Sequence, residues 1–296
     1  MYGRLLPAVI LALLTAASAC FAGYSDTGGV SQSIDGSSGQ IDWENINSSG
    51  SVYIGYYGFS GTSSATIDSG SSVDVEGLYI GYDSDNEGTL TLSGQGTEWN
   101  SGYNDDAIGG LGKGTLNVLD GAAYTSLTST IIGNSNQGTV VVDNATFEID
   151  SYLYLNKYSS DADNSSLTVT GGGTASAQGL IDIRYNSAAL NVEDGSMYAN
   201  EIFVNSSAVI NINIGLKGSL ELGSASSTQT ISDFLANGFT GGGSYDLKIW
   251  NDGSYADYSS LTENADYKVE DGVLFVPEPA TFSLLFLGGA GLIRRR

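Results

Sequence analysis

Short runs of alternating apolar and polar residues recur along the middle of the chain. In Thr115-Leu116-Asn117-Val118 every second residue is apolar, and a glycine comes just before the run. Alternation with a period of two puts successive side chains on opposite faces of an extended strand. Similar runs occur at 89–92, 139–142, 166–169, 189–192 and 209–212. The pattern predicts short β-strands that each have one apolar face.

Another strand-like segment precedes each of these runs and carries an apolar anchor residue. In the first four segments a glycine follows the anchor, as in Leu78-Tyr79-Ile80-Gly81. Successive anchors are 26, 28, 24, 23, 28 and 21 residues apart, with a mean of 25. A third, less regular strand follows the alternating run, as at Thr146–Ile149. The anchors are Ile54, Ile80, Ile108, Ile132, Leu155, Ile183 and Val204.

Repeats of this kind, with Gly, Asn or Asp at the corners, predict an all-β fold, a parallel β-solenoid (β-helix) of about seven coils. One coil cannot bury its apolar face alone, so each end needs a cap. We expect an N-terminal cap at 23–50, coils at 51–223, and a C-terminal cap at 224–276 with a short helix at 230–237. The main alternative is a β-sandwich of hairpins, which would lack the 25-residue period. The expected inward pairs are Leu90/Leu92, Leu116/Val118, Val140/Val142, Leu167/Val169, Leu190/Val192 and Ile210/Ile212.

Both ends of the chain differ from this body. Residues 1–22 combine one early charge, Arg4, with an apolar stretch and small residues before Ala22, which is typical of a secretory signal peptide. A lipobox-like sequence that ends at Cys20 is the weaker alternative. The last residues, 277–296, contain Pro-Glu-Pro, a short apolar run and three arginines. That run is shorter than the ~20 residues of a typical membrane helix, but a thinned bilayer or snorkelling arginines would let it span.

Read from Val276, this tail resembles the PEP-CTERM sorting domain of Gram-negative-type bacteria, in which the membrane enzyme exosortase is expected to process exported proteins. The resemblance implies an exosortase-type partner and transient membrane anchoring through the C-terminal segment. It also implies export to the cell envelope, the outer surface or the extracellular matrix, and it says nothing of activity. The implied sorting residues are Val276, Pro277, Glu278, Pro279, Arg294, Arg295 and Arg296.

The repeats carry a second resemblance. Ile80–Leu92 and Ile108–Val118 share the pattern Ile-Gly, four to six residues, then Gly-Thr-Leu. This pattern resembles the passenger repeats of autotransporter-type and PEP-CTERM β-helix proteins, best over residues 78–142. It weakens towards the C-terminus, where Asn156, Arg184 and Asn205 replace the first glycine.

Charge and composition exclude several functions. Residues 23–276 contain 32 acidic and 6 basic residues, a net charge of −26. Nucleic acid is therefore excluded as a partner, because phosphate binding needs clustered cations. The chain has no histidine, which removes Ser-His and Cys-His nucleophile systems and histidine metal centres. The one pair that resembles a lyase site is Asp182 with Arg184, and a surface ion pair explains it better. We therefore predict no enzyme, with a polysaccharide-degrading β-helix enzyme as an alternative.

One corner resembles the start of a calcium loop. Asp83, Asp85 and Glu87 follow the pattern D-x-D-x-acid-G, and carboxylates suit a hard cation. The twelfth position is Gly94 instead of glutamate, so the EF-hand pattern fails there. A polar turn is the favoured interpretation, and calcium at these three residues is the alternative. No other cofactor is predicted.

Aromatic residues fall on the outward side of the anchor strands. The outward column is Tyr53, Tyr79, Ala107, Ile131, Tyr154, Asp182 and Phe203, and Tyr82 lies just past its glycine. Aromatic faces stack on sugar rings, so we predict that Tyr53, Tyr79, Tyr82 and Tyr154 bind extracellular polysaccharide in a structural or adhesive role. The alternative is a purely structural role, in which the stacked rings only stabilise the sheet.

Ice binding is a further alternative, because some ice-binding proteins carry the same kind of tail and flat threonine-rich solenoid faces. A regular ice-binding face would repeat Thr-x-Thr on successive coils, and along the alternating strands it occurs only at 89–91 and 168–170. The predicted central outward column of the alternating strands is Thr91, Asn117, Val141, Thr168, Asn191 and Asn211.

Overall fold

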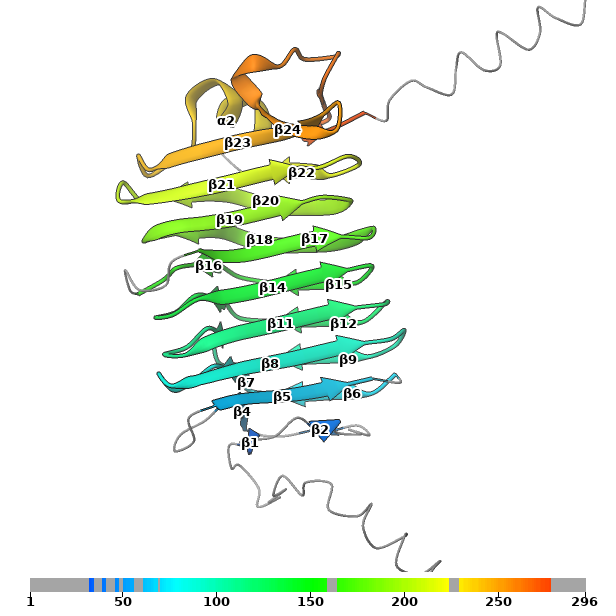
Figure 1. Ribbon diagram of the computed structural model, residues 1–296, viewed down its shortest axis with the longest axis vertical. Helices are drawn as coiled ribbons and strands as arrows, with labels where there is room; N and C mark the ends of the chain where they lie inside the picture. The colour runs from blue at the N-terminus through cyan, green and yellow to red at the C-terminus, as the bar shows by residue number, and fades with distance from the viewer. Residues whose placement is uncertain are drawn as a thin grey trace, which may run out of the picture.

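The computed structural model describes residues 32–34, 39–40, 46–47, 50–55, 61–68, 70–158, 164–223 and 229–277. It is a parallel β-solenoid, which confirms the predicted fold class. Coils stack along the long axis of the molecule, with α2 (Ile231–Asn237) and β24 (Ser254–Asp257) at the C-terminal end (Figure 1). Within the described residues, no helix is long and apolar enough to cross a membrane. The predicted signal peptide and residues 278–296 of the tail lie outside the described residues.

Each coil contributes three strands to two sheets. First strands and third strands join in a 16-stranded sheet, and second strands form a separate sheet of 10 strands. The long strands β18 (Gly173–Ile183) and β20 (Gly195–Val204) each serve as the third strand of one coil and the first strand of the next. The other first strands are β4 (Ser51–Ile54), β7 (Gly77–Ile80), β10 (Asp106–Ile108), β13 (Thr130–Ile132) and β16 (Leu153–Leu155).

The remaining strands complete the coils. Third strands are β6 (Ser72–Val75), β9 (Glu98–Ser101), β12 (Ala123–Ser126), β15 (Thr146–Ile149) and β22 (Ser219–Leu222). Second strands are β5 (Gly61–Ile67), β8 (Asn86–Ser93), β11 (Lys113–Leu119), β14 (Gly138–Asp143), β17 (Ser165–Thr170), β19 (Asn186–Val192), β21 (Ala208–Ile214) and β23 (Ser244–Asn251).

The register of the first strands matches the sequence prediction at every step. Ile54 pairs with Ile80, Ile80 with Ile108, and the ladder continues through Ile132, Leu155, Ile183 and Val204. All seven anchors are fully buried. Because these strands pair in parallel, the structure excludes a sandwich of antiparallel hairpins.

The second-strand ladder is confirmed except at its last step. Leu90, Leu116, Val140, Leu167 and Leu190 stack as predicted. Leu190 then pairs with Ile212, and Val192 with Ile214, so the expected pairing with Ile210 and Ile212 was wrong by two residues. A shift of two residues keeps every side chain on its face, so the core stays apolar. Asn213 therefore continues the outward column in place of Asn211.

The two glycines of the repeat pattern build one corner of the coil. Gly109 has a φ of +82°, a conformation that glycine adopts without steric cost. At Gly114, a Cβ atom would lie 2.7 Å from the carbonyl oxygen of Ile80 and closer still to the nitrogen of Gly109. Where Asn156 replaces the first glycine its φ is 55°, and its amide donates hydrogen bonds to Tyr185 O and Ser187 O. The corner thus explains both the glycines and their replacement by asparagine.

Strands continue the stack at both ends. Before β4, the short strands β1 (Gln32–Ile34), β2 (Gly39–Gln40) and β3 (Ile46–Asn47) pair in parallel with β4, β5 and β6, so strands of the predicted N-terminal cap extend the coils. At the other end β23 adds a parallel rung, with Leu247 and Ile249 next to Ile212 and Ile214. The predicted helix is present as α2, with a capping box between Thr230 and Asp233.

Antiparallel strands close the C-terminal end. β24 pairs with β23, and a hairpin of β25 (Lys268–Glu270) and β26 (Val273–Phe275) lies on β22. Phe234 of α2 stacks on Phe239, with 4.0 Å between ring centroids. Val276, the first residue of the predicted sorting motif, is buried directly after β26.

Candidate functional site

The outward column of first strands is formed as the sequence predicts. Tyr53 lies next to Tyr79, and the column runs through Ala107, Ile131, Tyr154, Asp182 and Phe203. Strands in a sheet are about 4.8 Å apart, so these side chains form a continuous strip parallel to the solenoid axis. Tyrosines occupy the strip in two groups.

The N-terminal tyrosine cluster consists of Tyr53, Tyr79 and Tyr82. The rings of Tyr53 and Tyr79 stack with centroids 4.8 Å apart and an interplanar angle of 12°. Tyr82 stands edge-on to both, with centroids 5.0 Å from Tyr53 and 5.8 Å from Tyr79, and it is 39% exposed. Burial, with smaller contributions from the nearby Tyr53 and acidic side chains, raises the pKa of Tyr79 to about 12. Its hydroxyl is therefore neutral near pH 7 and can donate or accept a hydrogen bond.

The central tyrosine cluster consists of Tyr152, Tyr154 and Tyr158. The centroid of Tyr154 is 5.9 Å from that of Tyr152, and Tyr158 is 60% exposed. Lys157 Nζ lies 4.0 Å from the centroid of Tyr154 and 4.9 Å from that of Tyr158, and the guanidinium carbon of Arg184 is 5.1 Å from Tyr154. These distances are typical of cation–π contacts. The cluster unites a predicted residue, Tyr154, with neighbours that the sequence did not indicate.

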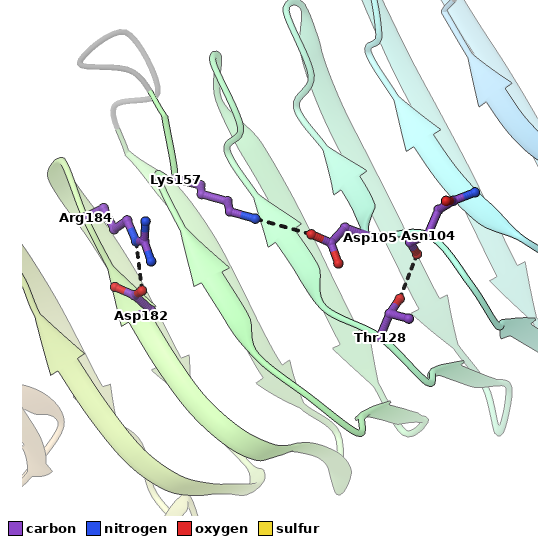
Figure 2. A network of polar contacts seen from close by, with 6 residues as sticks. All are labelled: Asn104, Asp105, Thr128, Lys157, Asp182 and Arg184. Carbon is purple, nitrogen blue, oxygen red and sulfur yellow. Dashed lines mark hydrogen bonds and ion pairs between the residues drawn. The ribbon is translucent and has the colours of Figure 1, made fainter.

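Ion pairs fix the cations of the central cluster (Figure 2). Lys157 Nζ is 3.3 Å from Asp105 Oδ2, and Arg184 Nε donates to Asp182 Oδ2 at 2.8 Å. Asp182 and Arg184, the pair that resembles a lyase site in the sequence, thus form an ion pair, which is the interpretation favoured above. Asp182 is only 6% exposed, and its Oδ1 accepts no hydrogen bond from any residue that the structure describes. A buried carboxylate oxygen without a partner leaves an acceptor beside the Tyr154 ring.

Two apolar positions separate the clusters. Ala107 and Ile131 point outward but are almost fully buried. The Lys157–Asp105 pair links the turn after β16 to the residue before β10, and so it bridges over β13, the strand that carries Ile131 (Figure 2). The gap between Tyr79 and Tyr154 amounts to three strand spacings, roughly 14 Å. One extended polymer could therefore contact both clusters.

The candidate calcium residues are not gathered around one point. The carboxylate of Asp83 accepts a hydrogen bond from Ser84 N at 2.7 Å, and its carbonyl accepts one from Asn86 N, as in a polar turn. Asp85 is exposed, and Glu87 lies 3.8 Å from Lys113 in an exposed ion pair. In the described part of the chain, no group of three or more acidic or cysteine side chains is placed to hold a metal ion.

The outward face of the 10-stranded sheet carries small polar side chains. A shallow groove of about 280 Å³ crosses β8, β11 and β14 there, lined by residues such as Thr89, Thr115 and Thr139. In the neighbouring column, amides donate to the preceding coil: Asn117 to Thr91 Oγ1 at 3.3 Å, Asn191 to Thr168 Oγ1 at 3.2 Å, and Asn213 to Asn191 Oδ1 at 2.7 Å. These bonds connect the coils and engage part of the polar surface.

The most perturbed acid, Asp106, lies inside the solenoid. Its carboxylate accepts hydrogen bonds from Tyr124 OH and, at 2.6 Å, from Leu78 N. Burial raises the pKa of Asp106 to about 7, and these hydrogen bonds partly oppose the shift. The sequence could have indicated this buried acid. In the aligned repeats, Asp106 occupies the inward position that Leu153 and Ile181 occupy in later coils. The Asp106 side chain is fully buried, so we assign it to the core and not to the surface site.

Comparisons of the chain with protein-family models, with curated proteins and with solved structures found no match.

Proposed function

We propose that this protein is an exported, structural or adhesive component of the cell surface or extracellular matrix that binds polysaccharide along its first-strand face. The observation that carries the proposal is the N-terminal tyrosine cluster, in which three tyrosines from adjacent coils meet at the surface. Stacked aromatic rings with neutral hydroxyls suit a sugar chain, which has apolar ring faces and polar edges. The central cluster adds a second contact on the same strip.

Charge narrows the ligand to neutral glycans. A body with a net charge of −26 repels acidic polymers, and both cations of the central cluster are already paired with aspartates. Acidic polysaccharide would need a bridging divalent cation such as calcium. We therefore expect neutral glycans to bind without metal and acidic ones only when calcium is present.

Removing the stacked rings should remove binding. The double variant Tyr53→Ala/Tyr79→Ala is expected to lower affinity for a neutral glycan at least about tenfold, because it deletes two stacking surfaces. A glycan array followed by titration calorimetry measures the change. Tyr198→Ala is the matched control, since Tyr198 is a half-buried outward tyrosine on β20 at a third-strand position. Equal affinity in the parent and the double variant, or loss of folding without glycan binding in the parent, would show that the cluster is a structural ladder.

The two ends of the chain support a proposal about where the protein is transported. We propose that residues 1–22 direct export and that the tail from Val276 holds the precursor at a membrane until an exosortase-type enzyme processes it. Deleting residues 277–296 should release the protein into the medium, and the intact protein should show a mature mass below that of the precursor. The same location for the two forms, with an intact protein that keeps the mass of its tail, would contradict this sorting role.

Ice binding is retained as a second candidate because of one observation. In the observed register, Ser64, Thr89, Thr115, Thr139 and Ser166 form an unbroken outward column of hydroxyls across five coils. Thermal hysteresis in a solution of the parent protein would favour this candidate over polysaccharide binding. The alternative of a polysaccharide-degrading enzyme is tested by incubating the protein with the same glycans and measuring whether new reducing ends form.

A further inference from the structure

The C-terminal cap contains a cleft of about 530 Å³ that lies apart from the tyrosine strip. Four segments form it: the β21–β22 turn, the end of β23 with the β23–β24 turn, the loop that leads into β25, and the residues directly after β26. The volume falls in the range of roughly 300–1,000 Å³ that small-molecule sites occupy.

Part of the cleft lining is apolar and aromatic. Trp250 contributes to it, half-buried at the end of β23. Its ring meets that of its cross-strand partner Tyr255 edge-on, with centroids 5.3 Å apart and an angle of 85°. Leu216 and Val276 supply aliphatic surface. Contact with Tyr255 holds the indole in place before any ligand arrives.

Planar polar groups also line the cleft, and hydrogen bonds hold two of them in place. Asn251 Nδ2 donates to Asp266 Oδ1 at 3.4 Å, and Asp266 Oδ2 accepts from Thr262 N at 2.8 Å. Asp252 and Asn264 also line the cleft, at positions where φ is 48° and 66°. Amide and carboxylate groups held in this way can each bond neighbouring hydroxyls of one ligand.

The charges of the cleft indicate an uncharged ligand. Among its lining residues, Lys268 is the one cation beside the two carboxylates of Asp252 and Asp266, so an anion would find no cluster of positive charge. No three carboxylates in the described chain are grouped to hold a metal ion. An indole together with amides and carboxylates in one cleft suits a ligand with an apolar face and several hydroxyls.

We propose that this cleft is a second saccharide site, which binds one or two neutral sugar units at the C-terminal end of the solenoid. This proposal is argued from the residues that line the cleft and does not depend on the tyrosine clusters. Two sites at different places along one rod would hold the same polymer with an avidity above that of either site alone.

Of the three tryptophans, Trp250 lies at the cleft, Trp99 is fully buried, and Trp43 lies outside the described residues, so comparison with Trp250→Phe assigns a change in tryptophan fluorescence to the cleft. The full chain, in a detergent without a sugar headgroup, is titrated with cellohexaose, laminarihexaose and chitohexaose to about 10 mM, well above a Kd of 1 mM. We expect a saturable change in fluorescence with at least one of them. This change should disappear in Trp250→Phe and persist in Tyr53→Ala/Tyr79→Ala, which separates the cleft from the tyrosine face.

Two glycine variants probe the polar side without straining the backbone. Asp252→Gly and Asn264→Gly remove side chains at positive φ, where glycine fits, and each should weaken binding roughly three- to tenfold. Circular dichroism confirms that they fold. The proposal is overturned by the absence of a saturable Trp250 response to all three oligosaccharides, or by a response of equal affinity in both glycine variants.

Discussion

Replacing Leu116 by aspartate is expected to unfold the coils around β11. Leu116 is fully buried and stacks between Leu90 and Val140 in the second-strand ladder. A carboxylate at this position would have no partner in an apolar interior, which costs several kcal/mol and is comparable to the whole stability of many domains. Leu116→Ala, which leaves only a cavity, should cost about 2–5 kcal/mol.

The neighbouring substitution Asn117→Asp is the matched control. Asn117 points outward, and its amide donates to Thr91 Oγ1, a hydroxyl that can donate to a carboxylate instead. We expect a change of under about 0.5 kcal/mol, as for most surface substitutions. Urea unfolding followed by circular dichroism compares the two variants. Similar destabilisation of both, or of neither, would mean that Leu116 does not point into the core.

Sequence alone predicted most of the register because two independent signals coincide. The period-2 pattern gives the face of each strand, and a glycine after Ile54, Ile80, Ile108 and Ile132 marks the same corner in successive coils. Corner and face together leave one alignment of the first strands. Asn156 continues the series because asparagine tolerates a positive φ.

The prediction of strand register failed where no glycine marks the corner of the coil. Ile210, Ile212 and Ile214 all point inward, so hydrophobicity cannot distinguish two alignments that differ by two residues. The turn decides instead, since Asn186 pairs with Ala208 at the start of the two strands. The rung at β5 was missed because its inward residues begin with Ser63 and Ala65, which give a weak apolar signal.

In the candidate site, too, residues in the repeated strands could be predicted from the sequence and residues in turns could not. Tyr53, Tyr79 and Tyr154 lie in strands, so their shared column follows from the register. Lys157 and Tyr158 lie in a turn, where no repeat relates one coil to the next, and their contacts with Tyr154 could not be foreseen. The cleft in the cap joins segments from outside the repeats, for which the sequence offers no pattern at all.

Asp106→Asn is expected to change how stability depends on pH. An aspartate has an ordinary pKa of 3.8, whereas burial raises the pKa of Asp106 to about 7 in the folded protein. Below pH 4 the carboxyl is protonated in both states and costs the fold nothing. Between pH 4 and pH 7 only the unfolded state releases the proton, so the folded state loses about 1.4 kcal/mol per pH unit, about 4 kcal/mol in total. Above pH 7 the carboxyl is ionised in both states and the loss stays constant.

Asparagine has nearly the same shape as aspartate but has no group that titrates in this pH range. Its carbonyl can accept from Leu78 N and its amide can donate to the oxygen of Tyr124, so both present partners keep a hydrogen bond. The variant should therefore gain stability over the parent as pH rises from 4 to 7, by up to about 4 kcal/mol. Urea midpoints measured across this range give the difference, and Asp85→Asn at an exposed position serves as the control for the loss of one carboxylate. If the difference between Asp106→Asn and the parent is the same at every pH, the Asp106 carboxyl is not held protonated inside the solenoid and is ionised in the folded protein as readily as in the unfolded chain.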